Sequence, residues 1–233
     1  RDDGAGGMVL TNCPFDKLAS KHTDVICHAN VALLQGVAVG TSETDRTVVF
    51  LYWKGNDCCI YLDTSGEPLS KRGYRKLPHA APMRETLAAA TIMATRWDKQ
   101  SNFVNPMCGS GTLAIEAALI ATNRAPGLLR ENFGFMHVQE YNPEIWQSLK
   151  KSAESAIIPF NARIIATDYD AKAIYAIREN ARLAGVDQLI EIDCCDFRDT
   201  TVPSGGGVVM LNPEYGERLG DIEHLEVVYK EIG

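Results

Sequence analysis

Four short segments of the sequence carry side chains that can bind a polar ligand, and each follows a run of apolar or β-branched residues. They are NPMCGSGT (105–112), Asp168 after IIAT, Asp196 after IEIDCC, and NPEY (212–215) after VVML. Runs of this kind predict strands. Polar groups at the carboxyl ends of successive parallel strands meet at one edge of the sheet. The spacing therefore predicts one binding site built from all four segments.

The segment 105–112 has the residues of a ligand-binding loop. A strand, a tight Gly-x-Gly turn and a helix present free backbone N–H groups and the positive end of a helix dipole to whatever lies above the sheet. Gly109 and Gly111 can adopt positive φ without strain, and a Cβ at either position would hold a ligand away from the backbone. We expect an anionic or electron-rich ligand there.

Two common nucleotide-binding loops are disfavoured by the residues that follow the turn. A P-loop needs Gly-Lys-Ser/Thr, whereas Gly111 is followed by Thr112-Leu113-Ala114. The dinucleotide fingerprint needs a third glycine and an acid about 20 residues further on, and the next strand-ending acid is the more distant Asp168. Taken one at a time, the loop and the two acids each have a purely structural interpretation as well. The loop could be a simple tight turn, Asp168 a helix N-cap, and Asp196 the start of a turn.

Cysteine and histidine chemistry is not favoured. The seven cysteines include no C-x-x-C pair, a pattern typical of reduced cytosolic thiols rather than of disulfides or zinc sites. Cys108 and Cys194 have no evident histidine partner for thiol catalysis. The five histidines show no metal-ligand spacing, so we expect no metal.

Composition and charge restrict the partners. The net charge of −7 argues against binding nucleic acid over the whole surface. One stretch without acids is basic, however, and contains Lys71, Arg72, Arg75, Lys76, His79 and Arg84. Such a strip can steer a polyanion, and a solvated charged loop is an equal alternative. No run reaches the roughly 18 apolar residues of a membrane span, so we expect a soluble, cytoplasmic protein with no membrane partner.

Strands separated by helices predict a doubly wound parallel α/β sheet. The predicted strands are Phe103–Val104, 163–167, 189–193 and 208–211, and the predicted helices cover 83–97, 112–122 and 171–184. Region 124–160 is interrupted by prolines and glycines, which predicts an insertion with one helix near 144–156. Two runs at 47–53 and 58–63 are rich in β-branched and aromatic residues and predict a β-hairpin.

The arrangement resembles an S-adenosylmethionine-dependent methyltransferase with a Rossmann-like sheet. The resemblance implies that Asp168 accepts hydrogen bonds from the cofactor's ribose and that Asp196 and Phe197 contact its adenine. It also implies that the loop holds the methionine part through Asn105, Pro106, Met107, Cys108, Gly109, Ser110, Gly111 and Thr112. The segment 212–215 is similar to the N-P-P-Y/F motif of enzymes that methylate exocyclic base amines, with Glu214 at the usual proline position.

Five blocks in order are similar to the THUMP-domain RNA methylase family of the UPF0020 type. They are LDTSGEPLSKRGYR (62–75), APMRETLAAA (81–90), NPMCGSGTLAIEAA (105–118), APGLLR (125–130) and NPEYGERLGD (212–221). The resemblance implies a partial α+β THUMP-like segment at 1–66 that ends in the hairpin, and a basic strip with a connecting helix at 67–100. It implies a methyltransferase core at 101–233. Sheets of this family have seven strands, so we expect the core to be incomplete at its C-terminus.

The resemblance also implies the reaction. Family members include bacterial methyltransferases of guanine N(2) in large-subunit ribosomal RNA, so we expect this chemistry on 23S ribosomal RNA, with transfer RNA as another substrate class. Asn212 and Pro213 would accept the two amine N–H bonds, and Tyr215 would stack on the base. Lys71, Arg72 and Arg75 would guide the RNA backbone. Three alternatives stay open: adenine-N(6) methylation of RNA or DNA, a non-catalytic RNA-binding or assembly protein, and a weaker NAD-dependent oxidoreductase.

Overall fold

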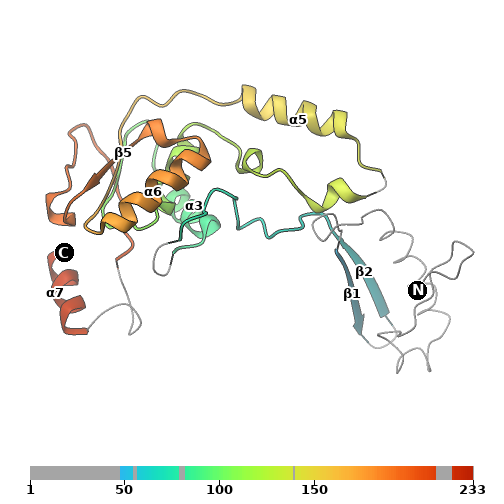
Figure 1. Ribbon diagram of the computed structural model, residues 1–233, viewed down its shortest axis with the longest axis horizontal. Coiled ribbons are helices and arrows are strands. Elements are labelled where there is room, and N and C mark those ends of the chain that lie inside the picture. Colours follow the sequence, from blue (N-terminus) through green and yellow to red (C-terminus); the bar gives the residue numbers. More distant parts are fainter. Residues whose placement is uncertain (1–47, 55–56, 79–81, 139, 214–221, 233) are drawn as a thin grey trace, which may run out of the picture. The chain divides into compact units, whose positions relative to one another are not determined.

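The computed structural model describes residues 48–54, 57–78, 82–138, 140–213 and 222–232 of the 233-residue chain (Figure 1). The chain divides into two compact units. The first contains residues 1–66 and 132–143, and the second contains residues 67–131 and 144–233. The second unit therefore includes both the segment 67–100 and the sheet with its binding loops.

The first unit contains the predicted hairpin. Strands β1 (Val48–Lys54) and β2 (Asp57–Asp63) pair antiparallel, with Phe50 opposite Tyr61. The hairpin prediction is confirmed. The 3₁₀ turn η2 (Gly134–His137) follows the hairpin in this unit, and the N–H of Phe135 donates to the carbonyl of Thr64 at 2.9 Å. The predicted THUMP-like segment falls largely on residues 1–47, which lie outside the described residues.

The second unit is built on a parallel four-stranded sheet. Its strands are β3 (Asn102–Asn105), β4 (Ile164–Asp168), β5 (Ile190–Cys194) and β6 (Gly207–Val209), in the order β5-β4-β3-β6. All three pairings are parallel. Helix α4 (Thr112–Ala121) lies between β3 and β4 in the chain, and α6 (Ala171–Ala184) lies between β4 and β5. The predicted Rossmann-like α/β sheet is confirmed.

Strand order reverses at β3. Strands β4 and β5 are added successively on one side of β3, whereas the chain then returns to place β6 on its other side. In open α/β sheets, ligands bind outside the carboxyl ends of the strands at such a reversal. The segments that follow β3 and β6 flank this point, and both carry predicted site residues.

Apolar helix α4 forms the centre of the core. Its sequence TLAIEAALIA is almost wholly apolar, and nine of its ten residues are buried. Helix α3 (Glu85–Ala94) packs against α4. Trp97 after α3 stacks obliquely on Phe103 of β3, with 5.1 Å between the ring centroids. A helix that is apolar all round is expected inside a layered fold, as this one is.

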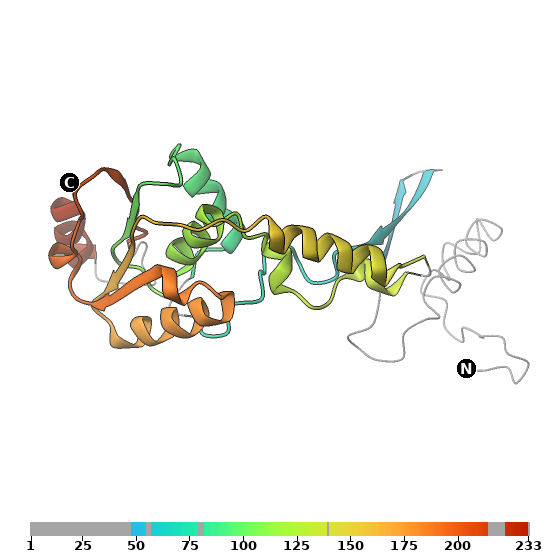
Figure 2. The same ribbon diagram turned by 90° about the horizontal axis from the view of Figure 1, so that it is seen from above.

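The remaining elements connect or close the second unit. Helix α5 (Pro143–Ser155) lies in the predicted insertion. The 3₁₀ turns are η1 (Pro126–Leu129), η3 (Asp187–Leu189) and η4 (Phe197–Asp199), and helix α7 (Ile222–Ile232, red in Figure 2) comes last. Helix α7 contacts η4 through an ion pair of 3.4 Å between Arg198 and Glu231.

Candidate functional site

The loop between β3 and α4 has a left-handed backbone at three positions. Met107, Gly109 and Gly111 have φ of 52°, 54° and 84°. The N–H of Gly111 donates to the carbonyl of Cys108 at 2.9 Å, which closes a tight turn. Gly111 is the N-cap of α4 and makes no side-chain cap. The first N–H groups of α4 therefore have no capping side chain at Gly111.

The two glycines of this loop are needed for different reasons. A Cβ on Gly109 would have no described heavy atom within 4 Å, so the space beside this residue is open. A Cβ on Gly111 would lie 2.2 Å from Cγ1 of Ile177 on α6. The predicted close approach of a ligand thus fits Gly109. Gly111 instead lets α6 pack against the loop, which differs from the sequence-based expectation.

Asp168 ties the end of β4 to the loop. Its side chain is buried, with 8% exposure. One oxygen accepts the N–H of Gly109 at 2.9 Å, and the other accepts the N–H of Asp170 at 3.0 Å. Each carboxylate oxygen keeps a second lone pair that can accept from a ligand. The N-cap of α6 is Asp170, which accepts the N–H of Lys172 at 2.8 Å, so the alternative reading of Asp168 as that cap is wrong.

Asp196 begins the turn that follows β5. It is the N-cap of η4, and its carboxylate accepts the N–H of Arg198 at 3.0 Å and the Nε of the same residue at 2.9 Å. The guanidinium of Arg198 lies 5.4 Å from the ring centroid of Phe197. The N–H of Cys195 donates to the carbonyl of Asp168 at 3.1 Å, which keeps this turn beside the end of β4.

Asn212 and Pro213 follow the end of β6. The N–H of Met210 donates to the carbonyl of Val104 at 2.8 Å. The carbonyl of Met210 accepts the side-chain amide of Asn105 at 2.8 Å. The segment is thus fixed to β3 two residues before Asn212, and Asn212 and Pro213 are half-buried. Glu214 and Tyr215 lie outside the described residues.

The structure brings most of the predicted site residues to one edge of the sheet. Gly109 and Asp168 are in direct contact. Asp196 lies two residues beyond β5, which pairs with β4, and Asn212 follows β6, which pairs with β3. Because all four strands run parallel, these residues share the carboxyl edge. The space beside Gly109 is open, and Asn212 follows the strand on the other side of β3.

The predicted basic strip is only partly open to solvent. The side chain of Lys71 is 65% exposed and pairs with Glu67 at 2.7 Å. The side chains of Arg72 and Arg75 are only 16% and 14% exposed, because they face the carboxylates of Glu116 and Glu85 at 3.5 and 3.2 Å. These ion pairs show that the two arginines have carboxylate partners within the protein, and the guidance of phosphates by Lys71, Arg72 and Arg75 stays a prediction.

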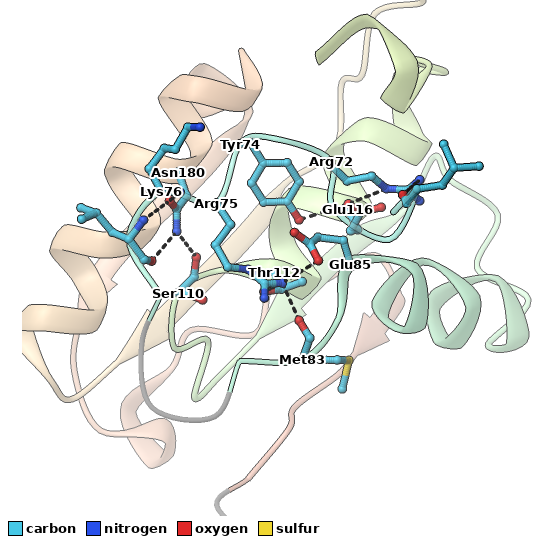
Figure 3. Close-up of polar contacts among 12 residues, drawn as sticks. Arg72, Tyr74, Arg75, Lys76, Met83, Glu85, Ser110, Thr112, Glu116 and Asn180 are labelled. Atoms are coloured by element: carbon cyan, nitrogen blue, oxygen red, sulfur yellow. Dashed lines mark hydrogen bonds and ion pairs between the residues drawn. The ribbon is translucent and has the colours of Figure 1, made fainter. Parts of the chain in front are cut away.

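Tyr74 and Glu116 form a buried polar pair that was not predicted as part of the site (Figure 3). Tyr74 donates to Glu116 at 3.1 Å, and both are almost fully buried. Burial raises the pKa of Glu116, while the neighbouring Arg72 opposes this shift. Burial also raises the pKa of the Tyr74 phenol, and the charge of Glu116 adds to the effect. One signal was available in the sequence: Glu116 is the only charged residue of an apolar helix.

Asn180 of α6 is a second buried residue that sequence reasoning missed. It is fully buried and hydrogen bonds both to the segment around Leu77 and to Ser110 of the loop. Its position on the apolar face of α6, four residues before Ala184, is the signal that could have found it, because a buried amide needs partners.

Metal-binding clusters and membrane-spanning helices are both absent from the part of the chain that the structure describes. No group of three or more His, Cys, Asp and Glu side chains there could hold a metal ion. None of the described helices is long and apolar enough to cross a membrane.

The family model and the curated relatives that match this chain are all named as methyltransferases. The family model described as "UPF0020: RMKL-like, methyltransferase domain" matches residues 72–233. The ribosomal RNA large subunit methyltransferase K/L of Psychromonas ingrahamii is 43% identical over 187 residues, which are 78% of this chain and 25% of that protein. The protein of the same name from Vibrio campbellii is 40% identical over 178 residues, 74% of this chain and 25% of that protein. The chain thus spans about a quarter of the length of these curated relatives.

Two solved structures resemble this chain over most of its length. SMU.472, described as a methyltransferase and crystallised with S-adenosylhomocysteine (SAH), has a TM-score of 0.73 and 30% identity, covering 82% of this chain and 50% of that one. A predicted N6-adenine-specific DNA methylase from Listeria monocytogenes has a TM-score of 0.75 and 34% identity, covering 90% of this chain and 55% of that one.

Proposed function

We propose that this chain, which belongs to the UPF0020 family of RMKL-like methyltransferase domains, binds S-adenosylmethionine and methylates an exocyclic base amine of RNA. The proposed target is guanine N(2) of 23S ribosomal RNA. The curated relatives named for large-subunit ribosomal RNA support the substrate class. The bound SAH of SMU.472 supports the cofactor.

The loop has the features that this cofactor requires. Open space beside Gly109 admits a close ligand, whereas a side chain there would fill it. The uncapped N-terminus of α4 suits the negative carboxylate of the methionine part. Asp168 retains lone pairs for the ribose hydroxyls. When bound, S-adenosylmethionine supplies an electrophilic methyl group on a sulfonium. Asn105 to Thr112, Asp168, Asp196 and Phe197 are the proposed binding residues.

Asn212 and Pro213 are proposed to hold the acceptor amine. A conjugated amine is a weak nucleophile because its lone pair is delocalised into the ring. Acceptors at both N–H bonds, the side-chain oxygen of Asn212 and the carbonyl of Pro213, favour a pyramidal nitrogen with an available lone pair. Tyr215 is proposed to stack on the base. The base must leave its helix to reach this position, and alignment of two reactants can supply about 7–11 kcal/mol of the barrier.

One observation carries this proposal. Gly109 is hydrogen bonded to Asp168 at 2.9 Å, while Asn105 at the start of the same loop is bonded at 2.8 Å to Met210, two residues before Asn212. A single loop thus links the proposed cofactor residues to the proposed acceptor residues. Such a link is expected where two substrates must react in line.

Adenine N(6) is the second candidate target. It is favoured by the similarity to the Listeria monocytogenes protein, whose name refers to N6-adenine-specific methylation of DNA. Both amines fit the same pair of acceptors, so the methylated product has to distinguish guanine N(2) from adenine N(6). Nucleoside mass spectrometry of ribosomal RNA and DNA after reaction should show N(2)-methylguanosine in RNA. N(6)-methyladenosine as the sole product would replace the first candidate by the second.

The Asn212→Ala variant tests the proposed role directly. Methyl transfer from tritiated S-adenosylmethionine to ribosomal RNA should be abolished, whereas the affinity for SAH measured by calorimetry should stay at the wild-type value. Asn161→Ala, which changes an exposed asparagine before β4, is the matched control and should retain both. Equal loss of SAH affinity and transfer in Asn212→Ala would contradict the assigned role. Wild-type SAH binding without transfer to any nucleic acid would support a non-catalytic binding protein instead.

A further inference from the structure

Asn180 joins three segments that lie far apart in the sequence (Figure 3). From α6, its side-chain oxygen accepts the N–H groups of Lys76 and Leu77 at 3.1 and 3.2 Å. Its side-chain nitrogen donates to the carbonyls of Leu77 and Ser110 at 2.9 and 3.1 Å. The residue is 0% exposed. Both amide N–H donors and both oxygen lone pairs are therefore used inside the protein.

The contact with Ser110 fixes one peptide plane of the loop. The carbonyl of Ser110 accepts from Asn180, and the N–H at the other end of the same peptide bond, on Gly111, donates to Cys108 at 2.9 Å. Gly111 has φ of 84°, and glycine tolerates either sign of φ at little cost. The φ preference of Gly111 therefore does not by itself fix the direction of this peptide plane. The two hydrogen bonds define its direction.

The segment on the other side of Asn180 holds the loop at a second point. Arg75 donates to the hydroxyl of Thr112 at 3.1 Å, and its guanidinium is held by Glu85 at 3.2 Å. Segment 72–77 thus ties the loop both at Ser110, through Asn180, and at Thr112, through Arg75. Neither tie places a heavy atom within 4 Å of a Cβ at Gly109, so the space beside this residue stays open.

We propose that Asn180 is a positioning residue for the cofactor loop. It holds the peptide plane between Ser110 and Gly111 so that the N–H groups at the start of α4 stay directed at the ligand. This inference rests on the proposed function, because it assumes that the ligand is S-adenosylmethionine. A loop that is held in the binding conformation avoids the loss of affinity that comes from a partly populated competent state.

The Asn180→Asp variant separates this role from general stability. Aspartate can still accept from Lys76 and Leu77 but cannot, when ionised, donate to Ser110, whose carbonyl it would repel. SAH affinity should fall by about tenfold, the loss expected when the loop is competent in about a tenth of the molecules. KM for S-adenosylmethionine should rise by a similar factor, while kcat at saturating cofactor should remain close to wild type.

Val186→Ala is the control for lost stability. Val186 is 1% exposed and lies two residues beyond the C-terminal end of α6, where it makes none of the hydrogen bonds that Asn180 makes to the loop, so its truncation should lower the melting temperature but leave SAH affinity and KM unchanged. Asn180→Ala is the second variant and should reproduce the affinity loss. Wild-type affinity in both folded Asn180 variants would overturn the proposal. The proposal would also be overturned if circular dichroism showed that both Asn180 variants fail to fold while Val186→Ala folds. Asn180 would then serve stability alone. If wild type itself does not bind SAH, the proposed function fails instead.

Discussion

Alanine at Gly111 and alanine at Gly109 should have different consequences, although the two residues are only two positions apart in one loop. At Gly111 the new Cβ would lie 2.2 and 2.6 Å from Cγ1 and Cδ1 of Ile177, and φ is 84°. A left-handed alanine costs about 1–2 kcal/mol, and overpacking adds about 1–3 kcal/mol. We expect Gly111→Ala to lower the free energy of unfolding by about 2–5 kcal/mol, the sum of these terms.

Gly109→Ala should destabilise the protein less than Gly111→Ala, because the added methyl group meets no described neighbouring atom. Gly109 has φ of 54°, but no described heavy atom lies within 4 Å of its added Cβ, so only the conformational term of about 1–2 kcal/mol applies. The methyl group would instead enter the open space assigned to the cofactor. SAH affinity should therefore fall in Gly109→Ala, even though this variant is the more stable of the two.

Urea unfolding measures the free energy of unfolding of each variant, and calorimetry measures its affinity for SAH. A double-mutant cycle with Ile177→Ala checks the cause, because that change removes the two closest atoms and leaves only Cβ, at 2.8 Å. The losses of Gly111→Ala and Ile177→Ala should be less than additive by about 0.5–3 kcal/mol. Additive losses, or equal destabilisation by alanine at Gly109 and Gly111, would refute the reasoning.

Three further substitutions test the surroundings of the loop. Burial raises the pKa of Glu116 above its ordinary 4.5 despite the opposing charge of Arg72. The contribution of Glu116 to stability is therefore complete when the pH is below its pKa in the unfolded chain, and it is lost as the pH rises through its pKa in the folded protein. Urea unfolding at several pH values should show wild type losing stability relative to Glu116→Gln over that window; a gap independent of pH would contradict this. Asp168→Asn retains one acceptor oxygen, so it should lower SAH affinity about tenfold or more by calorimetry. Asp170→Ala removes the N-cap of α6 and should cost about 1 kcal/mol in urea unfolding with SAH affinity unchanged.

Local sequence chemistry was enough to predict the strands and helices and the sheet edge that carries the candidate site residues. β-Branched runs defined the hairpin and the parallel strands, and Gly109 and Gly111 defined a turn that the structure has. The strand that ends near Met210 was also predicted, and its carboxyl end lies beside β3. In each case the signal is contained in a few consecutive residues, so no knowledge of distant contacts was needed.

The buried roles could not be predicted in this way. Arg72 and Arg75 belong to a stretch without acids, which is typical of a solvated or anion-binding surface. Their partners include Glu116, which is more than 40 positions away in the chain and lies on the buried helix α4. Whether a basic residue faces solvent or an internal carboxylate is decided by such distant contacts.

Burying polar groups such as Asn180 and Arg75 costs free energy, and the loop that they contact gives a physical reason for it. Apolar packing is non-directional, so it can bury α4 and α6 but cannot decide which way a peptide plane beside Gly111 faces. Hydrogen bonds have preferred directions. In the proposed function one face of the loop stays open for the cofactor, so the orientation of the loop is fixed by the bonds of Asn180 and Arg75 to Ser110 and Thr112. Apolar residues of similar volume often preserve or increase stability at buried ionic sites, but here they would leave the loop without a defined direction.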